Sequence, residues 1–212
     1  MVTAAYHQFC MNGYLGTTIT AIAGDAGVAV PTIYYTFGTK ARLLDEALGA
    51  AILGFDRWHE PPTNPSIEEL LPWHHWWTDF NAAPTSAEAL GIFLTHGVAI
   101  LERCAPLVAA LHGAAGDPEA AAVARIAEQR RVQAYRQAAR VIAAKAGGLR
   151  DGLTTKAATD VLVVLFSAEL YQSIRQGRGW SVDRTALFLR KLLSEQLLRS
   201  DRQRTSDHPH PV

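Results

Sequence analysis

The sequence has little cysteine, no long apolar run and no excess of charge of either sign. The two cysteines among 212 residues, Cys10 and Cys104, lie among apolar neighbours, which excludes a disulfide framework and indicates reduced thiols in a cytoplasmic protein. The longest apolar run, Val161–Phe166, is too short to span a bilayer, and no basic-then-apolar leader opens the chain. A net charge of +0 gives no general sign of a nucleic-acid or membrane partner.

The residue patterns of catalysis and of metal binding are also missing. No serine lies in a strand-to-helix elbow, no glycine-rich phosphate loop is present, and no cysteine pairs evidently with a histidine, so we expect neither an enzyme nor a cofactor. His74 and His75 would diverge by about 100° on a helix, and His96 and His112 have no cysteine or carboxylate at ligand spacing. We therefore expect no metal site.

The composition is that of a globular, all-α chain. Hydrophobic residues make up 49% and charged residues 19%, and alanine-rich runs outnumber strand-like alternation. About nine helices are expected. Beyond the first 40 residues they cover about 40–55, 66–80, 86–103 up to a bend at Pro106, 118–146, 154–176 and 182–198. Pro61, Pro62 and Pro65 indicate a linker. We expect domains at 1–46 and 47–199 and a disordered tail at 200–212, which contains His208 and His210.

A helix-turn-helix is predicted near the start of the chain. Ile19–Ala26 forms a short amphipathic helix, Gly27 can end it at positive φ, and Pro31 suits the first turn of the next helix. In that second helix Val28 and Ile33 would face the core, and the outward side chains are Pro31, Thr32, Tyr34 and Tyr35. This surface suits a DNA groove, although a Gly-x-x-x-Pro turn between two helices of a bundle has the same pattern.

The segment around this turn resembles the amino terminus of the tetracycline-repressor (TetR) family. The matching residues are Ala4, Ala5, Phe9, Gly13, Tyr14, Thr17, Ile22, Ala23, Ala26, Gly27, Val28, Thr32, Ile33, Tyr34, Phe37, Lys40 and Leu43. The resemblance implies an all-helical homodimer with an N-terminal three-helix DNA-binding domain and a C-terminal domain that binds a small-molecule inducer and dimerises. It also implies phosphate contacts from Thr17, Thr18 and Lys40, and major-groove contacts from Thr32 and Tyr34.

Two of these residues have simpler interpretations as well. Thr17 could be the N-cap of the second helix, and Lys40 could be a solvated surface lysine. The chain also departs from the family pattern: Ala29 and Val30 replace the usual serine and polar residue, and Thr36 replaces a frequent aromatic. Base recognition is therefore expected to be unusual.

The N-terminal 46 residues have few positive charges for a partner that is a polyanion. Two cations, Lys40 and Arg42, stand against the carboxylates of Asp25, Asp45 and Glu46, which leaves a formal charge of −1. Phosphate neutralisation normally supplies much of the affinity for DNA. Two explanations stay open: the sequence begins inside the first helix and a basic segment precedes it, or the chain has lost tight DNA binding.

An aromatic group follows the proline-rich linker. Trp73, Trp76, Trp77 and Phe80 have the i, i+3, i+4, i+7 spacing of a core-facing helix stripe. The same rings could line an apolar pocket with polar groups from other helices, and the two interpretations have similar weight. The predicted ligand-site residues are Trp73, Trp77, Phe80, Phe93, His96, Tyr135 and Phe166. The ligand expected there is mostly hydrophobic and aromatic.

The last helices have more apolar surface than one small bundle needs to cover. We expect part of this surface to form a four-helix dimer interface, and the alternative is packing within one chain. The predicted interface residues are Leu162, Leu165, Leu170, Leu189, Leu192 and Leu193.

Together these features predict a ligand-responsive transcriptional regulator. We expect a repressor that binds a palindromic operator as a dimer, and a ligand that releases the repressor from DNA through a movement of the fourth helix. Activation rather than repression stays open. Two rival interpretations are a helical ligand-binding dimer with weak or lost DNA binding, and a helical enzyme or cofactor carrier.

Overall fold

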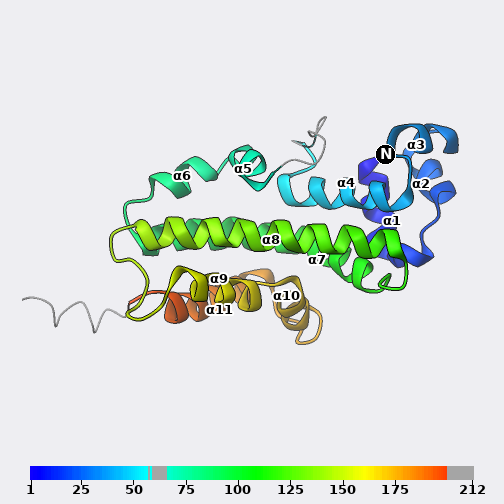
Figure 1. The fold of residues 1–212 in the computed structure, drawn as a ribbon. Helices are drawn as coiled ribbons and strands as arrows, with labels where there is room; N and C mark the ends of the chain where they lie inside the picture. Colours follow the sequence, from blue (N-terminus) through cyan, green and yellow to red (C-terminus); the bar gives the residue numbers. More distant parts are fainter. Residues whose placement is uncertain (57, 59–65, 200–212) are drawn as a thin grey trace, which may run out of the picture. The chain divides into compact units, whose positions relative to one another are not determined.

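The computed structural model describes residues 1–56, 58 and 66–199, and within these residues every named element is a helix (Figure 1). The helices are α1 Val2–Gly16, α2 Ile19–Ala26, α3 Val30–Phe37, α4 Lys40–Leu53, α5 Ile67–Leu70, η1 Leu71–Trp73 (a 3-10 turn), α6 Trp77–Ala82, α7 Ser86–His112, α8 Pro118–Ala144, α9 Thr155–Leu165, α10 Ala168–Arg175 and α11 Val182–Leu197. The prediction of an all-α fold is confirmed. The predicted linker prolines and the predicted tail lie outside the described residues.

The chain forms two compact units. One unit contains residues 1–73 and 99–130, and the other contains residues 74–98 and 131 onward. α7 and α8 each contribute residues to both units. The predicted boundary at residue 46 stays a prediction; residue 46 lies within α4, which continues to Leu53.

In the first unit α1 packs mainly against α4 and α2. Phe9 is fully buried, as are Leu43, Leu44 and Ala47 of α4. The chain breaks helical geometry at Gly13 (φ 68°, ψ 174°), so α1 is kinked before its last turn. This left-handed backbone suits a glycine because it has no Cβ.

Two predicted helices are shorter than expected. The segment after the linker is not one helix to Phe80: Ser66 and Glu69 form a capping box on α5, and Pro72 then falls in the 3-10 turn. Proline removes a backbone donor and clashes with the preceding turn, so the four aromatic residues share no single helical stripe. The expected helix 154–176 is likewise two helices, because Phe166 leaves helical geometry and Ser167 caps α10.

One predicted helix is longer than expected. α7 runs through Pro106 to His112 instead of ending near Arg103. An interior proline costs a helix about 3 kcal/mol, but Cys104, Ala105 and Leu107 on either side of it are buried. Burial of this face outweighs the local cost.

Two stretches pass a membrane-span criterion based on length and hydropathy, Ser86–His112 and Thr155–Arg175. Core helices of helical proteins meet the same criterion, and 44% of each window is buried within the chain. The apolar-run argument from sequence did not detect these stretches, because interspersed glycine and polar residues interrupt them.

Candidate nucleic-acid interface and ligand site

The turn between α2 and α3 has the geometry that the sequence predicted. Gly27 is left-handed (φ 66°, ψ 30°), and the Val28 N–H donates to the Ala23 carbonyl at 3.0 Å, which is the Schellman pattern at a helix end. Pro31 lies in the first turn of α3, where a missing N–H costs little. Ile33 is buried, whereas Val28 is half-buried in the turn itself and not in the helix.

The outward surface of α3 consists of uncharged side chains. Pro31 and Thr32 are exposed, and the two tyrosines are the large residues among them, with Tyr34 51% and Tyr35 94% exposed. These four residues were predicted to face DNA. The structure brings them together on one short helix, and their contact with DNA stays a prediction.

The residue that caps α2 is Thr18, not Thr17. The Thr18 hydroxyl accepts from the Ala21 N–H at 3.1 Å, and Thr18 is exposed at the helix N-terminus. Thr17 is only 1% exposed, and its hydroxyl lies within donor distance of the Gly13 carbonyl (2.7 Å) and the Gln8 carbonyl (3.0 Å). Thr17 therefore stabilises the kinked end of α1, and its buried hydroxyl is not available to a phosphate.

Lys40 is engaged within the protein. Its Nζ donates to the Tyr14 carbonyl at 2.9 Å and to the Thr17 carbonyl at 3.1 Å, and it lies 4.1 Å from the centre of the Tyr14 ring. The solvated-lysine interpretation does not match this geometry, and the phosphate contact of Lys40 stays a prediction. Lys40 instead holds the end of α1 to the start of α4.

The second cation of the N-terminal 46 residues is paired as well. Arg42 lies 3.7 Å from Asp45 and 3.4 Å from Glu46. Asp45 also faces Arg130 of α8 at 3.6 Å. Together with Lys40, this leaves residues 1–46 with no cationic side chain directed only to solvent.

α4 is also tied at its other end. Arg103 of α7 donates from Nε to the Ala51 carbonyl at 2.7 Å and from Nη2 to the Ile52 carbonyl at 3.3 Å. Tyr6 of α1 donates its hydroxyl to the Arg103 carbonyl at 3.0 Å, and burial raises the pKa of Tyr6 to about 12. The last carbonyls of α4 thus receive charge-assisted hydrogen bonds from α7.

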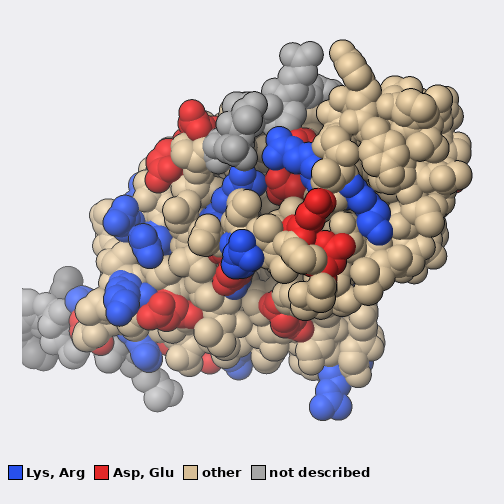
Figure 2. Space-filling view, turned by 45° about the vertical axis from the view of Figure 1, so that its right-hand side comes forward, with Lys and Arg blue, Asp and Glu red and all other residues tan. Residues whose placement is uncertain are grey.

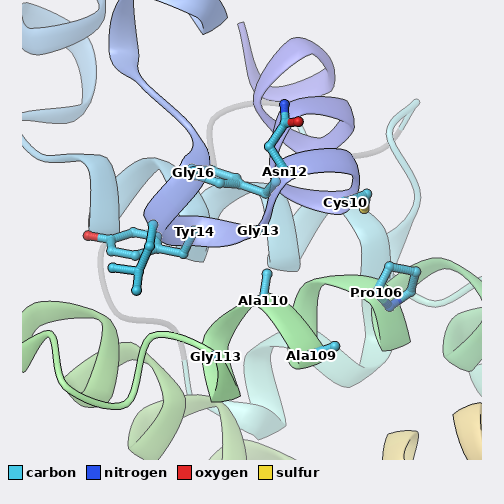
Figure 3. A pocket seen from close by; sticks show the side chains of 11 residues that line it. Cys10, Asn12, Gly13, Tyr14, Gly16, Pro106, Ala109, Ala110 and Gly113 are labelled. Carbon is cyan, nitrogen blue, oxygen red and sulfur yellow. The ribbon is translucent and has the colours of Figure 1, made fainter.

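A cavity of about 350 Å³ lies between α1 and α7 of the same unit (Figure 3). The α1 wall includes Cys10, Gly13 and Tyr14, and the facing wall consists of Pro106, Ala109 and Ala110 of α7 and of Gly113, which follows α7. Burial raises the pKa of the Cys10 thiol, which keeps it protonated at neutral pH. The sequence reasoning missed this cavity; the small residues of α7 and the glycine in α1 are the signal that could have indicated it.

In the other unit, aromatic rings from α6, α7 and α8, from the residue that precedes α6 and from the residue that follows α9 form one cluster around Phe93. The centroid of Phe93 lies 6.2 Å from that of Trp76, 6.0 Å from Phe80, 5.7 Å from Tyr135 and 5.6 Å from Phe166. All five are buried. Most of these rings meet edge-to-face or tilted, as packed aromatic cores do. Trp76, absent from the predicted site, is central to the cluster.

The polar groups of this cluster lie at its edges. The Tyr135 hydroxyl donates to the Phe166 carbonyl at 2.7 Å, at the break between α9 and α10. His96 stacks on Trp76, with centroids 5.5 Å apart and planes at 5°. Burial, and then the neighbouring His75, lower the pKa of His96.

The predicted ligand-site residues do not all belong to this cluster. Trp77, Phe80, Phe93, His96, Tyr135 and Phe166 lie in one unit, whereas Trp73 belongs to the other. Trp77 and His96 are half-buried and reachable from outside. The direct ring contacts indicate a packed core among the described residues, and the ligand role stays a prediction.

Three of the six predicted dimer residues are covered within their own chain. Leu162, Leu189 and Leu193 are at most 1% exposed, because α9 packs against α11. Leu165, Leu170 and Leu192 are half-buried. The exposed apolar side chains of these helices are different ones: Val164 (65%), Leu187 (69%) and Phe188 (39%).

The fold and the turn define a helix-turn-helix protein with a larger helical part. Residues 2–47 match the family model described as "Bacterial regulatory proteins, tetR family". This N-terminal segment is therefore similar to that of TetR-family transcriptional regulators. No curated protein sequence matches the chain.

Solved structures of similar fold cover nearly the whole chain. A Saccharomonospora viridis regulator in complex with choline has a TM-score of 0.67 at 19% identity and covers 94% of this chain and 96% of its own. The regulator FadR of Bacillus subtilis, in complex with stearoyl-CoA, has a TM-score of 0.63 at 16% identity and covers 91% of this chain and 95% of its own. NalD of Pseudomonas aeruginosa, the secondary repressor of a multidrug efflux pump, has a TM-score of 0.58 at 21% identity and covers 94% of this chain and 94% of its own. At these identities the likeness concerns the fold.

Proposed function

We propose that this regulator is a ligand-responsive repressor, located in the cytoplasm, that binds a palindromic operator as a homodimer. The observation that carries the proposal is the α2–α3 turn, with left-handed Gly27 and an exposed outer surface on α3. Recognition helices of such motifs enter the major groove, and a twofold dimer holds two of them about one helical turn apart.

The proposed dimer face lies on α9 and α11. Val164, Leu187 and Phe188 leave large apolar side chains exposed on these two helices, and exposed apolar groups of this size favour a protein partner. A second copy of the same helix pair would cover them. Sedimentation velocity tests this: the native chain should sediment as a dimer, and Leu187→Glu should give a monomer.

The proposed ligand site is the aromatic cluster around Phe93. Its interior is apolar, and its polar groups lie at the rim, as in many small-molecule sites. The half-buried Trp77 and His96 would be the first to meet a hydrophobic or aromatic ligand. Because the rings contact one another directly, ligand entry requires them to separate, which gives the ligand a preference for one conformation.

α4 is the proposed connection between ligand and DNA. Arg103 of α7 and Arg130 of α8 hold α4, and the same two helices carry Phe93, His96 and Tyr135. A shift of α7 or α8 on ligand binding would move α4 and with it the spacing of the two α3 helices. DNA release follows from the changed spacing.

The test combines DNA selection with ligand titration. The full chain is used to select binding duplexes from a random library, and fluorescence anisotropy then measures affinity with indole, stearoyl-CoA or choline added. Trp77→Ala is the matched variant. We expect one probe to release DNA from the native chain and not from the variant. If none of the three probes changes the DNA affinity of the native chain, ligand-controlled release by these classes of compound is refuted.

A second candidate function is a ligand-binding helical dimer with weak or lost DNA binding. The observation that favours it is the engagement of both Lys40 and Arg42 within the protein, which leaves residues 1–46 poor in groups that neutralise phosphate. Selection that enriches no duplex, together with a dimer that binds a probe, would establish this candidate instead.

A further inference from the structure

The surface of α3 lacks every side-chain type that reads a base through paired hydrogen bonds. Such reading uses Arg or Lys on guanine, Asn or Gln on adenine, and Asp or Glu on cytosine. α3 is Val-Pro-Thr-Ile-Tyr-Tyr-Thr-Phe and contains none of these six. Guanine, the base most often recognised in this way, therefore has no evident partner on this helix.

What α3 does present is uncharged and largely aromatic. Tyr35 is 94% exposed and Tyr34 51%, and Pro31, Thr32 and Thr36 are exposed beside them. The Thr36 hydroxyl donates to the Thr32 carbonyl at 2.8 Å, so its hydrogen is used inside the helix. The feature of the major groove that suits rings and methyl groups is the C5-methyl of thymine.

Phosphate attraction adds little to this surface. Residues 1–39 contain no lysine or arginine. The outer part of the molecule around α2 and α3 accordingly shows no blue side chains on the face drawn in Figure 2. The next two cations, Lys40 and Arg42, are engaged by backbone carbonyls and carboxylates. Few counterions would be released on binding by this part of the chain.

We propose that the operator is recognised through thymine methyl groups by Tyr34, Tyr35, Thr32 and Thr36, with little phosphate neutralisation. This inference rests on the proposed operator binding and specifies its chemistry. It predicts thymines at the contacted positions of each half-site and an affinity that depends weakly on salt.

The first test alters single atoms of the DNA. Duplexes selected by the full chain are resynthesised with deoxyuridine in place of each thymine in turn, which removes only the methyl group. Burial of one methyl group corresponds to about fourfold in affinity, so at least one position per half-site should weaken binding about fourfold. Replacing guanine by 7-deazaguanine, which lacks the N7 acceptor, should leave affinity unchanged.

The second test measures salt dependence. The slope of log K against log salt is about −0.9 for each phosphate neutralised. We expect a slope between 0 and about −2 for the native chain, compared with about −5 to −9 for six to ten phosphate contacts. Thr36→Lys adds one exposed cation and should steepen the slope by about 0.9 per protomer.

Variants of the exposed ring separate recognition from folding. Tyr35→Ala should weaken DNA binding and abolish the sensitivity to deoxyuridine at one position. Tyr35→Phe, which keeps the ring, should retain the native affinity and the native sensitivity. Ile126→Ala on α8, an exposed apolar residue outside the motif, is the matched control and should change neither. The inference would be overturned, and the proposed operator binding would stand, if affinity were unchanged by deoxyuridine, if it required guanine N7, or if the native chain showed a steep dependence of log K on log salt. Failure to select any duplex would refute the proposed operator binding and the inference with it.

Discussion

Replacing Lys40 tests whether this residue stabilises the protein or contacts DNA. Lys40→Met retains the aliphatic stem but loses two charge-assisted hydrogen bonds, to carbonyls at 2.9 and 3.1 Å, and the contact with the Tyr14 ring. At a half-buried site each hydrogen bond contributes about 1 kcal/mol and the ring contact about 0.5–1 kcal/mol. The expected loss is about 2–3 kcal/mol in the local opening of α1 and α2.

Amide hydrogen exchange is the assay because it reports local opening in a chain of two units, where one global transition is not assured. Exchange in the last turn of α1 and in α2 should accelerate about 30- to 150-fold. Lys156→Met, which removes an exposed lysine on α9, is the matched control and should change nothing there. Unchanged exchange in Lys40→Met, combined with lost DNA affinity, would refute the structural role and restore the phosphate contact.

Three further predictions concern stability. Gly97→Ala should lower the melting temperature, because its Cβ would lie 2.5 Å from the Phe166 ring and overpacking costs about 1–3 kcal/mol. Thr18→Ala should destabilise α2 by about 1 kcal/mol through loss of its N-cap, measured by hydrogen exchange. The lowered pKa of His96, caused first by burial and then by His75, means that the unfolded state binds the proton more readily. Stability is therefore full above the unfolded pKa of about 6.5 and falls as pH decreases towards the folded value; His96→Phe should flatten this dependence in urea titrations.

Each of these predictions has a neighbour as control. Gly91 lies in the same helix as Gly97, but a Cβ there would meet only the Arg190 guanidinium at 3.6 Å. Gly91→Ala should therefore stabilise the protein through its gain in helix propensity. Equal effects of alanine at the two glycines would contradict the packing argument. Thr20→Ala, at an exposed position that caps nothing, should be nearly neutral. A urea midpoint that stays constant from pH 7 to 5 in the native chain would exclude the histidine effect.

Much of the helix-turn-helix could be predicted from the sequence because its signals are local. Gly27 and Pro31 fix the turn through backbone conformation alone, and the bounds of α2 were predicted residue for residue. The aromatic cluster was partly predictable. Phe93, Tyr135 and Phe166 meet as expected, and Trp76 is buried as the core-facing spacing predicted. Trp73 lies instead in the 3-10 turn with Pro72 and belongs to the other unit.

Helix ends and turns depend on residues a few positions apart, so residue order alone predicts a helical chain and the position of its helix-turn-helix. The packing of distant segments determines which polar groups already have hydrogen-bond partners and which apolar groups are already buried. Lys40 meets carbonyls of α1, which are more than twenty positions away in the sequence. Leu162, Leu189 and Leu193 are buried by one another's helices and not by a partner. Whether a side chain is free to bind a partner depends on which distant segment of the chain contacts it. Residue spacing within one helix does not predict such contacts.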